Sequence, residues 1–399
     1  MVGNGEGRGF LDLASYYMHI LYVTNDWYES VVHRNLVFAI SRCRADIRIS
    51  VYVPLKVYET ADVDKDFPDN VRVYTSFVLR NCHKFLYKSK LRVLLKDVQE
   101  TIPDMHTVDL THSATQCLGG GLALELKKKM GIPYITAVRN TDVNVYYRFL
   151  IWQRGVFQKI LDHADRILFI SEVYKQYFLN NYIPGQKKRS VIAKSEMLQN
   201  GIDLIYLSNR EYSHRICPER LVFIGNFVEN KNIHGVIEAV KLLRERRYNL
   251  TFTAIGQKAN DLTPYNKLMN EYQRRYEWVE LKSRMSKQEL VEHLKDYDIF
   301  TMVSHHETFG LVYIEALSQG LPILYTEGQG IDRYFEEGTV GFHAKSGSVR
   351  DIADKLEQII KNYSKQVEYI KQLSLDEFRW SEISKKYIEL YNKVKPLLK

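Results

Sequence analysis

The alternation of short strand-like runs with helix-length segments is the feature that most constrains how this chain can fold. Runs rich in Val, Ile and aromatic residues occupy residues 19–24, 47–53, 71–76, 107–113, 134–139 and 166–171. A second series occupies residues 221–227, 250–256, 276–282, 298–304, 321–326 and 341–345. Amphipathic stretches separate most of these runs, which is typical of parallel sheets covered by helices. The sequence therefore predicts an α/β protein with two doubly wound, Rossmann-like domains.

The domain boundary is expected where the periodicity stops, at residues 201–218. A chain of 399 residues is also longer than one typical domain. We assign residues 18–204 to a first domain and residues 205–378 to a second. Residues 379–399 read as a helix that returns to the first domain. Residues 1–17 are polar and Gly-rich, and we treat them as an N-terminal extension whose status the sequence leaves open.

The net charge of +8 allows three kinds of partner: nucleic acid, an anionic membrane surface or a phosphorylated substrate. Residues 1–204 hold 27 Lys and Arg against 21 Asp and Glu, whereas residues 205–399 hold 29 against 27. The excess therefore lies in the first domain. No nucleic-acid-binding module accompanies it, so nucleic acid is not expected as a partner.

The four cysteines show neither a C-x-x-C motif nor metal-ligand spacing, which disfavours a zinc site or a disulfide framework. Two D-x-D matches, at residues 62–64 and 296–298, are the weak candidates for a metal site. No metal or cofactor is expected. No apolar run reaches the roughly 18 residues of a membrane span, and a secretory leader is not evident. A cytoplasmic location follows as the expectation.

The most informative stretch is SHHETFGLVYIEALSQGLPILYT, residues 304–326. A strand ends in a loop, a helix begins near Gly310, and a Gly-x-Pro sequence ends that helix before the next strand. Ligands of open α/β sheets bind at such strand ends. The backbone N–H groups of Phe309, Gly310 and Leu311 would favour an anionic phosphate there.

Two carboxylates flank this helix start, Glu307 before it and Glu315 inside it. A carboxylate accepts two hydrogen bonds at once, which suits vicinal hydroxyls of a ribose or a hexose. The alternative is that Glu307 merely favours the helix N-terminus and Glu315 is a solvated helical residue.

Three motifs carry a resemblance to a known family: residues 307–323 (ETFGLVYIEALSQGLPI), residues 223–232 (FIGNFVENKN) and residues 198–203 (LQNGID). Over residues 18–399 the chain resembles the retaining GT-B glycosyltransferases of family 4. The resemblance implies two Rossmann-like domains with a cleft between them and a C-terminal crossover helix. It further implies an acceptor-side first domain and a nucleotide-sugar-binding second domain.

The resemblance implies metal-independent transfer of a sugar, with retention, from a nucleotide-sugar to a hydroxyl of a glycan or lipid-linked acceptor. We favour a UDP-sugar donor and a role in bacterial surface polysaccharide or glycoconjugate synthesis. Two alternatives stay open: a catalytically weak scaffold subunit of a glycosylation complex, and a sugar-nucleotide epimerase or hydrolase.

The family's donor-site roles fall on named residues of the second half. Glu307 would bind donor-sugar hydroxyls, Glu315 the ribose, and Lys231 the leaving diphosphate. Asn226 stands where the family commonly has an Arg, so it can donate hydrogen bonds but adds no charge. The resemblance gives the full donor-binding set as Gly225, Asn226, Gly256, Arg284, Met285, Thr308, Phe309, Gly310, Leu311 and Glu315.

The first half matches the family less well. His112 corresponds to a histidine near the reacting centre, although a lone His is more often structural. The loop after the first strand holds Trp27 and Tyr28 where the family has glycines, and these rings would either stack on a sugar or pack locally.

A third segment of the first half, AVRNTDVN, differs from the family pattern. Asp142 matches that pattern, whereas Arg139 and Asn140 depart from it. All three are expected on the acceptor side. Arg139 could supply the positive charge that Asn226 lacks.

Residues 80–96 hold six Lys and Arg and no acid. On a helix, Lys84, Lys88 and Arg92 would follow one face, opposite an apolar stripe that includes Leu91. Such a segment fits either an anionic membrane surface or a domain helix with a solvated basic face. A peripheral location on the inner face of the cell membrane is the corresponding expectation.

Overall fold

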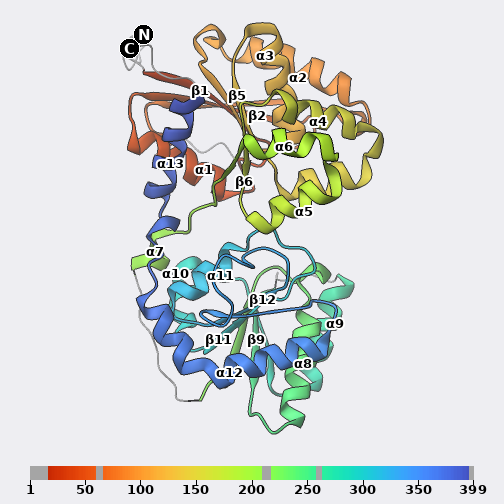
Figure 1. Cartoon of the computed structure of the whole chain (residues 1–399), viewed down its shortest axis with the longest axis vertical. Coiled ribbons are helices and arrows are strands. Elements are labelled where there is room, and N and C mark those ends of the chain that lie inside the picture. Colours follow the sequence, from red (N-terminus) through yellow and green to blue (C-terminus); the bar gives the residue numbers. More distant parts are fainter. Residues whose placement is uncertain (1–16, 60–65, 209–216, 258–262, 395–399) are drawn as a thin grey trace, which may run out of the picture. The chain divides into compact units, whose positions relative to one another are not determined.

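The computed structural model describes residues 17–59, 66–208, 217–257 and 263–394. These residues form two compact units, each built on its own sheet (Figure 1). The first unit contains the described parts of residues 1–169, 182–198 and 383–399. The second unit contains the described parts of residues 170–181 and 199–382. The predicted extension, except residue 17, and the aspartates of the first D-x-D motif lie outside the described residues.

The first sheet has seven parallel strands in the order β3-β2-β1-β4-β5-β6-β7. At its centre Ile20 lies opposite Ile49 on one side and Leu110 on the other. The strands are β1 (Met18–Val23), β2 (Ile47–Lys56), β3 (Val71–Leu79), β4 (Leu110–Ser113), β5 (Tyr134–Ala137), β6 (Arg166–Phe169) and β7 (Ser195–Met197).

The second sheet has six parallel strands in the order β10-β9-β8-β11-β12-β13. Here Val222 lies opposite Thr253 and Phe300. The strands are β8 (Arg220–Ile224), β9 (Thr251–Gln257), β10 (Val279–Ser283), β11 (Ile299–Thr301), β12 (Ile323–Thr326) and β13 (Gly341–Ala344).

Helices flank both sheets, and each unit buries its own apolar cluster between the layers (Figure 1). The α-helices are α1 (Val31–Cys43), α2 (Tyr87–Thr101), α3 (Gly121–Met130), α4 (Arg154–His163), α5 (Glu172–Tyr182), α6 (Gly185–Ala193), α7 (Leu204–Ser208), α8 (Ile233–Glu245), α9 (Pro264–Arg275), α10 (Lys287–Leu294), α11 (Leu311–Ser318), α12 (Val349–Gln372) and α13 (Trp380–Val394). Single turns of 3-10 or π-helix are η2 (Asn81–Lys84), η3 (Met105–Thr107), η4 (Gln116–Gly120), η5 (Asp142–Tyr147), η6 (Ile151–Gln153), η7 (Glu229–Lys231) and η8 (Asp376–Phe378).

The two parallel sheets confirm the predicted fold class of two doubly wound domains. Gly131 ends α3 in the left-handed conformation, with φ of 74°, which glycine adopts readily. The division of the chain departs from the expected boundary at residue 204, because residues 170–181 and 199–204 group with the second unit. Most of α13, from Ile383 onward, groups with the first unit.

In each sheet the strand order reverses beside a central strand, β1 in the first and β8 in the second. The chain leaves such a switch point in opposite directions, which opens a crevice at the carboxyl ends of the strands. Both cavities described below lie at these edges. In the part of the chain that the structure describes, no helix combines the length and the apolar character needed to cross a bilayer.

Candidate functional site

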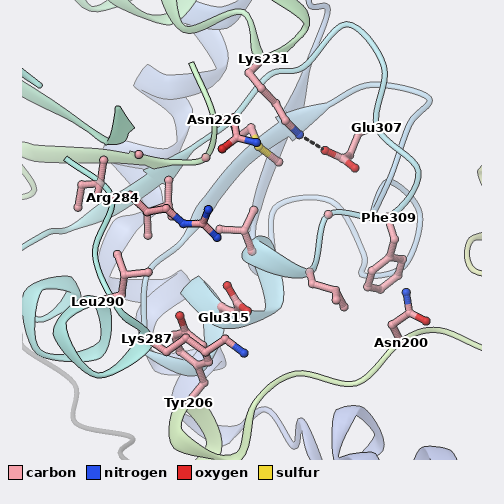
Figure 2. A pocket seen from close by; sticks show the side chains of 18 of the residues that line it. Asn200, Tyr206, Asn226, Lys231, Arg284, Lys287, Leu290, Glu307, Phe309 and Glu315 are labelled. Atoms are coloured by element: carbon pink, nitrogen blue, oxygen red, sulfur yellow. Dashed lines mark hydrogen bonds and ion pairs between the residues drawn. The ribbon is translucent and has the colours of Figure 1, made fainter. Parts of the chain in front are cut away.

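A cavity of about 520 Å³ lies at the carboxyl edge of the second sheet, within the second unit. Segments that follow β8, β9, β10 and β11 line it, together with the start of α11 (Figure 2). Every donor-site residue predicted in the second half lies on this cavity: Gly225, Asn226, Lys231, Gly256, Arg284, Met285, Glu307, Thr308, Phe309, Gly310, Leu311 and Glu315.

Lys231 and Glu307 form an ion pair at one end of this cavity, which we name the donor pocket after the predicted role of its residues. The Lys231 Nζ lies 2.7 Å from Glu307 Oε2, and the side chains are only 23% and 12% exposed (Figure 2). The Glu307 backbone N–H donates to Gln329 Oε1 at 2.8 Å, and its other carboxylate oxygen accepts from the Thr308 N–H at 3.0 Å. The carboxylate is therefore fixed by partners on both sides while it still faces the cavity.

Asn232 positions Lys231 at the start of α8. It adopts a left-handed conformation, with φ of 51°, and its buried amide donates to the carbonyls of Val303 and Ser346. Asn is one of the few residues that tolerate this backbone conformation. The turn that carries Lys231 is thereby tied to the segment that follows β11.

The start of α11 forms the adjoining wall. Gly310 precedes the helix with φ of 81°, in the left-handed region, and a Cβ there would lie 2.5 Å from the Tyr313 ring. The Phe309 ring is 3% exposed and packs against Tyr334 and Phe378. This anchor holds the helix start in place, so its backbone N–H groups and the positive end of the helix dipole border the cavity.

Two glycines allow the ends of β8 and β9 to approach closely. Gly256 has φ of 134°, and a Cβ there would collide with the carbonyl oxygen of Gly225. The Gly225 N–H donates to the Ile255 carbonyl at 3.0 Å. Asn226 follows directly and exposes its side chain toward the cavity (Figure 2).

A capping box places Arg284 and Met285 before α10. Ser286 accepts a hydrogen bond from the Glu289 N–H, and the Glu289 carboxylate accepts one from the Ser286 N–H at 2.7 Å. The Arg284 side chain is exposed and extends toward the middle of the pocket (Figure 2). It is therefore a cation available to an anionic ligand inside this unit.

Glu315 lies on α11 in the floor of the pocket (Figure 2). Burial raises the pKa of its carboxyl to about 7. The positive charge of Lys287 lowers this pKa, and the negative charge of Asp203 raises it. Lys287 itself pairs with Asp203, Nζ to Oδ2, at 2.9 Å. Glu315 is half-buried, so the alternative that it is merely a solvated residue of the helix does not fit.

The pocket includes residues that the sequence interpretation did not name. Lys287 directly follows the predicted Arg284–Met285 pair and its capping Ser, which could have indicated it. Asn200 belongs to the quoted LQNGID motif, and Tyr206 follows that motif on α7. The remaining additional residues are Ile170, Ile224, Ile255, Leu290, Met302 and Val312.

His112 lies in a buried aromatic cluster of the first unit. Its Nδ1 lies 2.7 Å from the Tyr391 hydroxyl, and its ring stacks on Tyr387 with centroids 5.4 Å apart. Burial holds the pKa of His112 well below its ordinary value, and the positive charge of Arg139 lowers it further. The imidazole is therefore neutral, and its surroundings favour a structural contribution. Its expected place near the reacting centre stays a prediction.

Trp27 is completely buried, and its ring packs edge-on against Phe38 of α1. The sequence allowed either local packing or stacking on a sugar for this ring. Its burial shows that Trp27 packs locally. Tyr28 differs: it is partly exposed and its hydroxyl bonds to Thr75 Oγ1 at 2.6 Å. It lines a second cavity, of about 320 Å³, at the carboxyl ends of β1, β2 and β3.

Asp142 is also fully buried, so it is not placed to touch an acceptor. Its carboxylate accepts hydrogen bonds from the backbone N–H groups of Gln116, Cys117 and Arg139, at 2.7 to 3.1 Å. Burial raises its pKa, and these N–H donors oppose the rise. Asp142 thereby joins the segment after β5 to the start of η4. Asn140 is exposed and accepts a hydrogen bond from Asn144.

The described residues contain no cluster of three or more His, Cys, Asp or Glu that could hold a metal ion. In the second D-x-D motif, Asp298 is buried and accepts from the N–H groups of Glu219 and Arg220, both at 2.8 Å. That carboxylate supports the strand ends instead of facing a ligand.

Comparison with known proteins agrees with this site. Residues 210–374 match the family model of the glycosyl transferases group 1. An uncharacterized glycosyltransferase of Methanocaldococcus jannaschii is 24% identical over 267 residues, which cover 66% of this chain and 69% of the relative. The capsular polysaccharide biosynthesis glycosyltransferase CapM of Staphylococcus aureus is 26% identical over 212 residues, about half of each chain.

The fold recurs in a solved structure. The crystal structure of HepE from Anabaena, in complex with UDP and glucose, aligns with a TM-score of 0.65 and 14% identity, and the match covers 94% of this chain and 99% of HepE. The family match lies on the unit that carries the donor pocket. The second unit therefore matches the glycosyl transferases group 1 in sequence, and the whole chain is similar to glycosyltransferases and shares the fold of HepE.

Proposed function

We propose that the protein transfers a sugar, with retention, from a UDP-sugar to a hydroxyl of a glycan or lipid-linked acceptor. The observation that carries the proposal is the convergence of all predicted donor-site residues on one cavity. The solved HepE complex contains UDP and glucose, which supports a UDP-sugar donor. The name of the Staphylococcus aureus relative supports a role in bacterial polysaccharide synthesis.

The charge of the pocket suits a diphosphate. Lys231, Arg284 and Lys287 line it against two carboxylates, and Glu315 with a pKa of about 7 is only partly ionised near neutral pH. The N-terminus of α11 adds partial positive charge. We propose that Lys231, Arg284 and this helix start stabilise negative charge on the departing diphosphate without a required metal. Asn226 contributes hydrogen bonds there but no charge.

The two carboxylates have separate tasks in this scheme. Glu307 orients the donor sugar by accepting hydrogen bonds from its hydroxyls, and Glu315 accepts those of the ribose. The bond from the anomeric carbon to the diphosphate oxygen breaks as the acceptor oxygen bonds on the same face. The acceptor proton then passes to the departing phosphate oxygen, so both atoms and charge balance.

The state of the cysteines indicates the cellular compartment in which the protein works. Cys43, Cys82, Cys117 and Cys217 are all unpaired thiols, which supports a reducing, cytoplasmic compartment. We propose that the enzyme works there, peripherally at the inner face of the membrane, where it would meet a lipid-linked acceptor.

The donor is tested by thermal shift and nucleotide release with UDP-, GDP-, ADP- and CMP-sugars. We expect a UDP-sugar to stabilise the protein and to be turned over. Glu307→Ala should lower turnover about a hundredfold, whereas Glu271→Ala, an exposed Glu on α9, should leave it unchanged. The anomeric configuration of the product, read by NMR, checks retention. The proposal would be contradicted if none of the four nucleotide-sugars were turned over, or if the product had the inverted anomeric configuration.

The diphosphate charge is tested in the same titrations. Arg284→Gln should weaken UDP binding about tenfold, since it removes a cation from the pocket. Asn226→Arg in that background should restore part of the affinity. Arg139→Gln, in the first unit, tests the compensation expected from the sequence. If Arg139→Gln weakens UDP binding and Arg284→Gln does not, then Arg284 does not bind the diphosphate.

A further inference from the structure

Five large apolar side chains of the first unit are more than half exposed in two short segments. Phe85 and Leu86, between η2 and α2, are 68% and 56% exposed. Phe149, Ile151 and Trp152, between η5 and α4, are 61%, 61% and 67% exposed. A contiguous apolar patch of this kind marks an interaction site in a folded protein.

The two segments lie side by side. The Gln153 side chain donates to the Phe85 carbonyl at 3.3 Å. Behind them, the ring centroids of Tyr87 and Phe157 are 5.4 Å apart, so the start of α2 packs against α4. Residues 85–86 and 149–152 therefore form one surface, which we call the apolar tip.

Basic residues flank both segments of the apolar tip in the sequence, and acidic residues are missing from these stretches. Residues 80–96 and 143–161 contain no Asp or Glu. The exposed cations of these segments are Arg80, Lys88, Arg92, Lys96, Arg148 and Lys159. Such a combination of exposed aromatic and aliphatic side chains with a cationic rim complements an anionic bilayer, whose headgroups are negative and whose interior is apolar.

The geometry changes the expectation for residues 80–96. The apolar stripe of α2, which includes Tyr87, Leu91, Leu94 and Val98, is buried in the first unit. This helix is therefore not free to lie in a membrane with that face inserted. The apolar surface available to a bilayer comes from the turn before α2 and from the separate segment before α4.

We propose that the apolar tip inserts into the boundary between headgroups and acyl chains of an anionic membrane, while the surrounding cations contact the headgroups. Trp and Phe are suited to this depth, because their rings are largely apolar and Trp also carries a polar N–H group. This inference names the surface by which the glycosyltransferase proposed above would contact the membrane. It rests on the proposed function only for the reason why such a contact would be useful.

Residues 80–96 and 143–161, which contain the apolar tip, also line the second cavity. Membrane docking would therefore bring this cavity close to the bilayer. Arg80, His83 and Lys90 of residues 80–96 line this cavity, and so does Tyr146 of residues 143–161. The Lys90 ammonium lies 3.3 Å from the Tyr146 hydroxyl, and burial lowers its pKa to about 8. A polar headgroup of a lipid-linked acceptor would thus find hydrogen-bonding groups next to the docked surface.

The test is co-sedimentation of the full chain with vesicles of phosphatidylglycerol and phosphatidylcholine in equal parts, compared with pure phosphatidylcholine. We expect binding to the anionic vesicles and a blue shift of Trp emission that Trp152→Phe removes. Phe85→Ser with Trp152→Ser should reduce the partition coefficient at least about tenfold, because two large apolar side chains no longer insert. Tyr369→Ser, at an exposed residue of α12, is the control.

The charge contribution has a matched pair of variants. Lys88→Glu with Arg148→Glu should weaken binding to anionic vesicles, whereas Lys267→Glu with Arg274→Glu, the same charge change on α9, should not. All variants should keep the UDP-sugar thermal shift, which separates this inference from the proposed function. Wild-type chain that stays in the supernatant, or equal binding by the Phe85→Ser, Trp152→Ser variant, would overturn the docking surface.

Discussion

Glu315 links the pH dependence of stability to the ribose-binding role proposed for it. Burial raises its pKa from 4.5 to about 7. Between these two values the folded chain keeps a proton that the unfolded chain has released. The contribution of Glu315 to the free energy of unfolding is therefore most favourable below pH 4.5 and falls as the pH rises to about 7.

We expect Glu315→Gln to remove this decline, so that the variant gains stability relative to wild type between pH 5 and pH 8, by up to roughly 3 kcal/mol. Unfolding temperatures of both proteins at the two pH values measure the difference. Affinity for a UDP-sugar should rise in wild type as the pH passes 7, because the carboxylate accepts ribose hydrogen bonds. Calorimetric titration should show a flatter pH dependence in Glu315→Gln. The same slope in both proteins would dismiss Glu315 as the ribose ligand.

At the scale of elements, the start of α11 depends on a backbone conformation that only glycine adopts readily. Gly310→Ala combines a strained φ with a contact against the Tyr313 ring. We expect a loss of about 1–3 kcal/mol in stability and weaker UDP binding, because the helix start must shift. Gly347→Ala is the control, since a Cβ there meets nothing within 4 Å. Thermal unfolding and UDP titration report the two effects, and an unchanged UDP affinity would argue against phosphate binding at this helix.

Strands could be predicted from the sequence wherever their burial was continuous. β2 is an example, since nine of its ten residues are buried and its central run is Val, Tyr and Ile-rich. β7 was not predicted, because Ser195–Met197 is a half-buried edge strand of three residues without β-branched side chains. Its existence depends on pairing with β6, which is a tertiary interaction.

The two halves of the molecule differ in how far the sequence could predict a site. Most of the predicted donor residues follow strand ends, and parallel topology brings such positions to one edge of a sheet. In the first unit, Trp27 points into the core and Asp142 binds the backbone of a segment 26 residues earlier. A loop sequence does not indicate in which direction a side chain points. The apolar tip was missed for a related reason, because its two segments, residues 85–86 and 149–152, come together only through folding.

The C-terminal helix gives a prediction for the whole molecule. Residues from Ile383 onward belong to the first unit, where Tyr387 and Tyr391 cover His112. Removing residues 383–399 would expose this buried cluster and leave the His112 ring without its hydrogen-bond partner. The donor pocket lies wholly in the other unit.

We therefore expect the truncated chain to lose the unfolding transition of the first unit, or to shift it to much lower temperature, while UDP still stabilises the second. The milder Tyr391→Phe should cost about 1–2 kcal/mol, the loss of one buried hydrogen bond, and Tyr369→Phe on exposed α12 should cost nothing measurable. Differential scanning calorimetry with and without UDP separates the two transitions. If truncation abolished UDP stabilisation, the second unit would need the first in order to fold or to bind nucleotide, and donor binding could not be assigned to one unit alone.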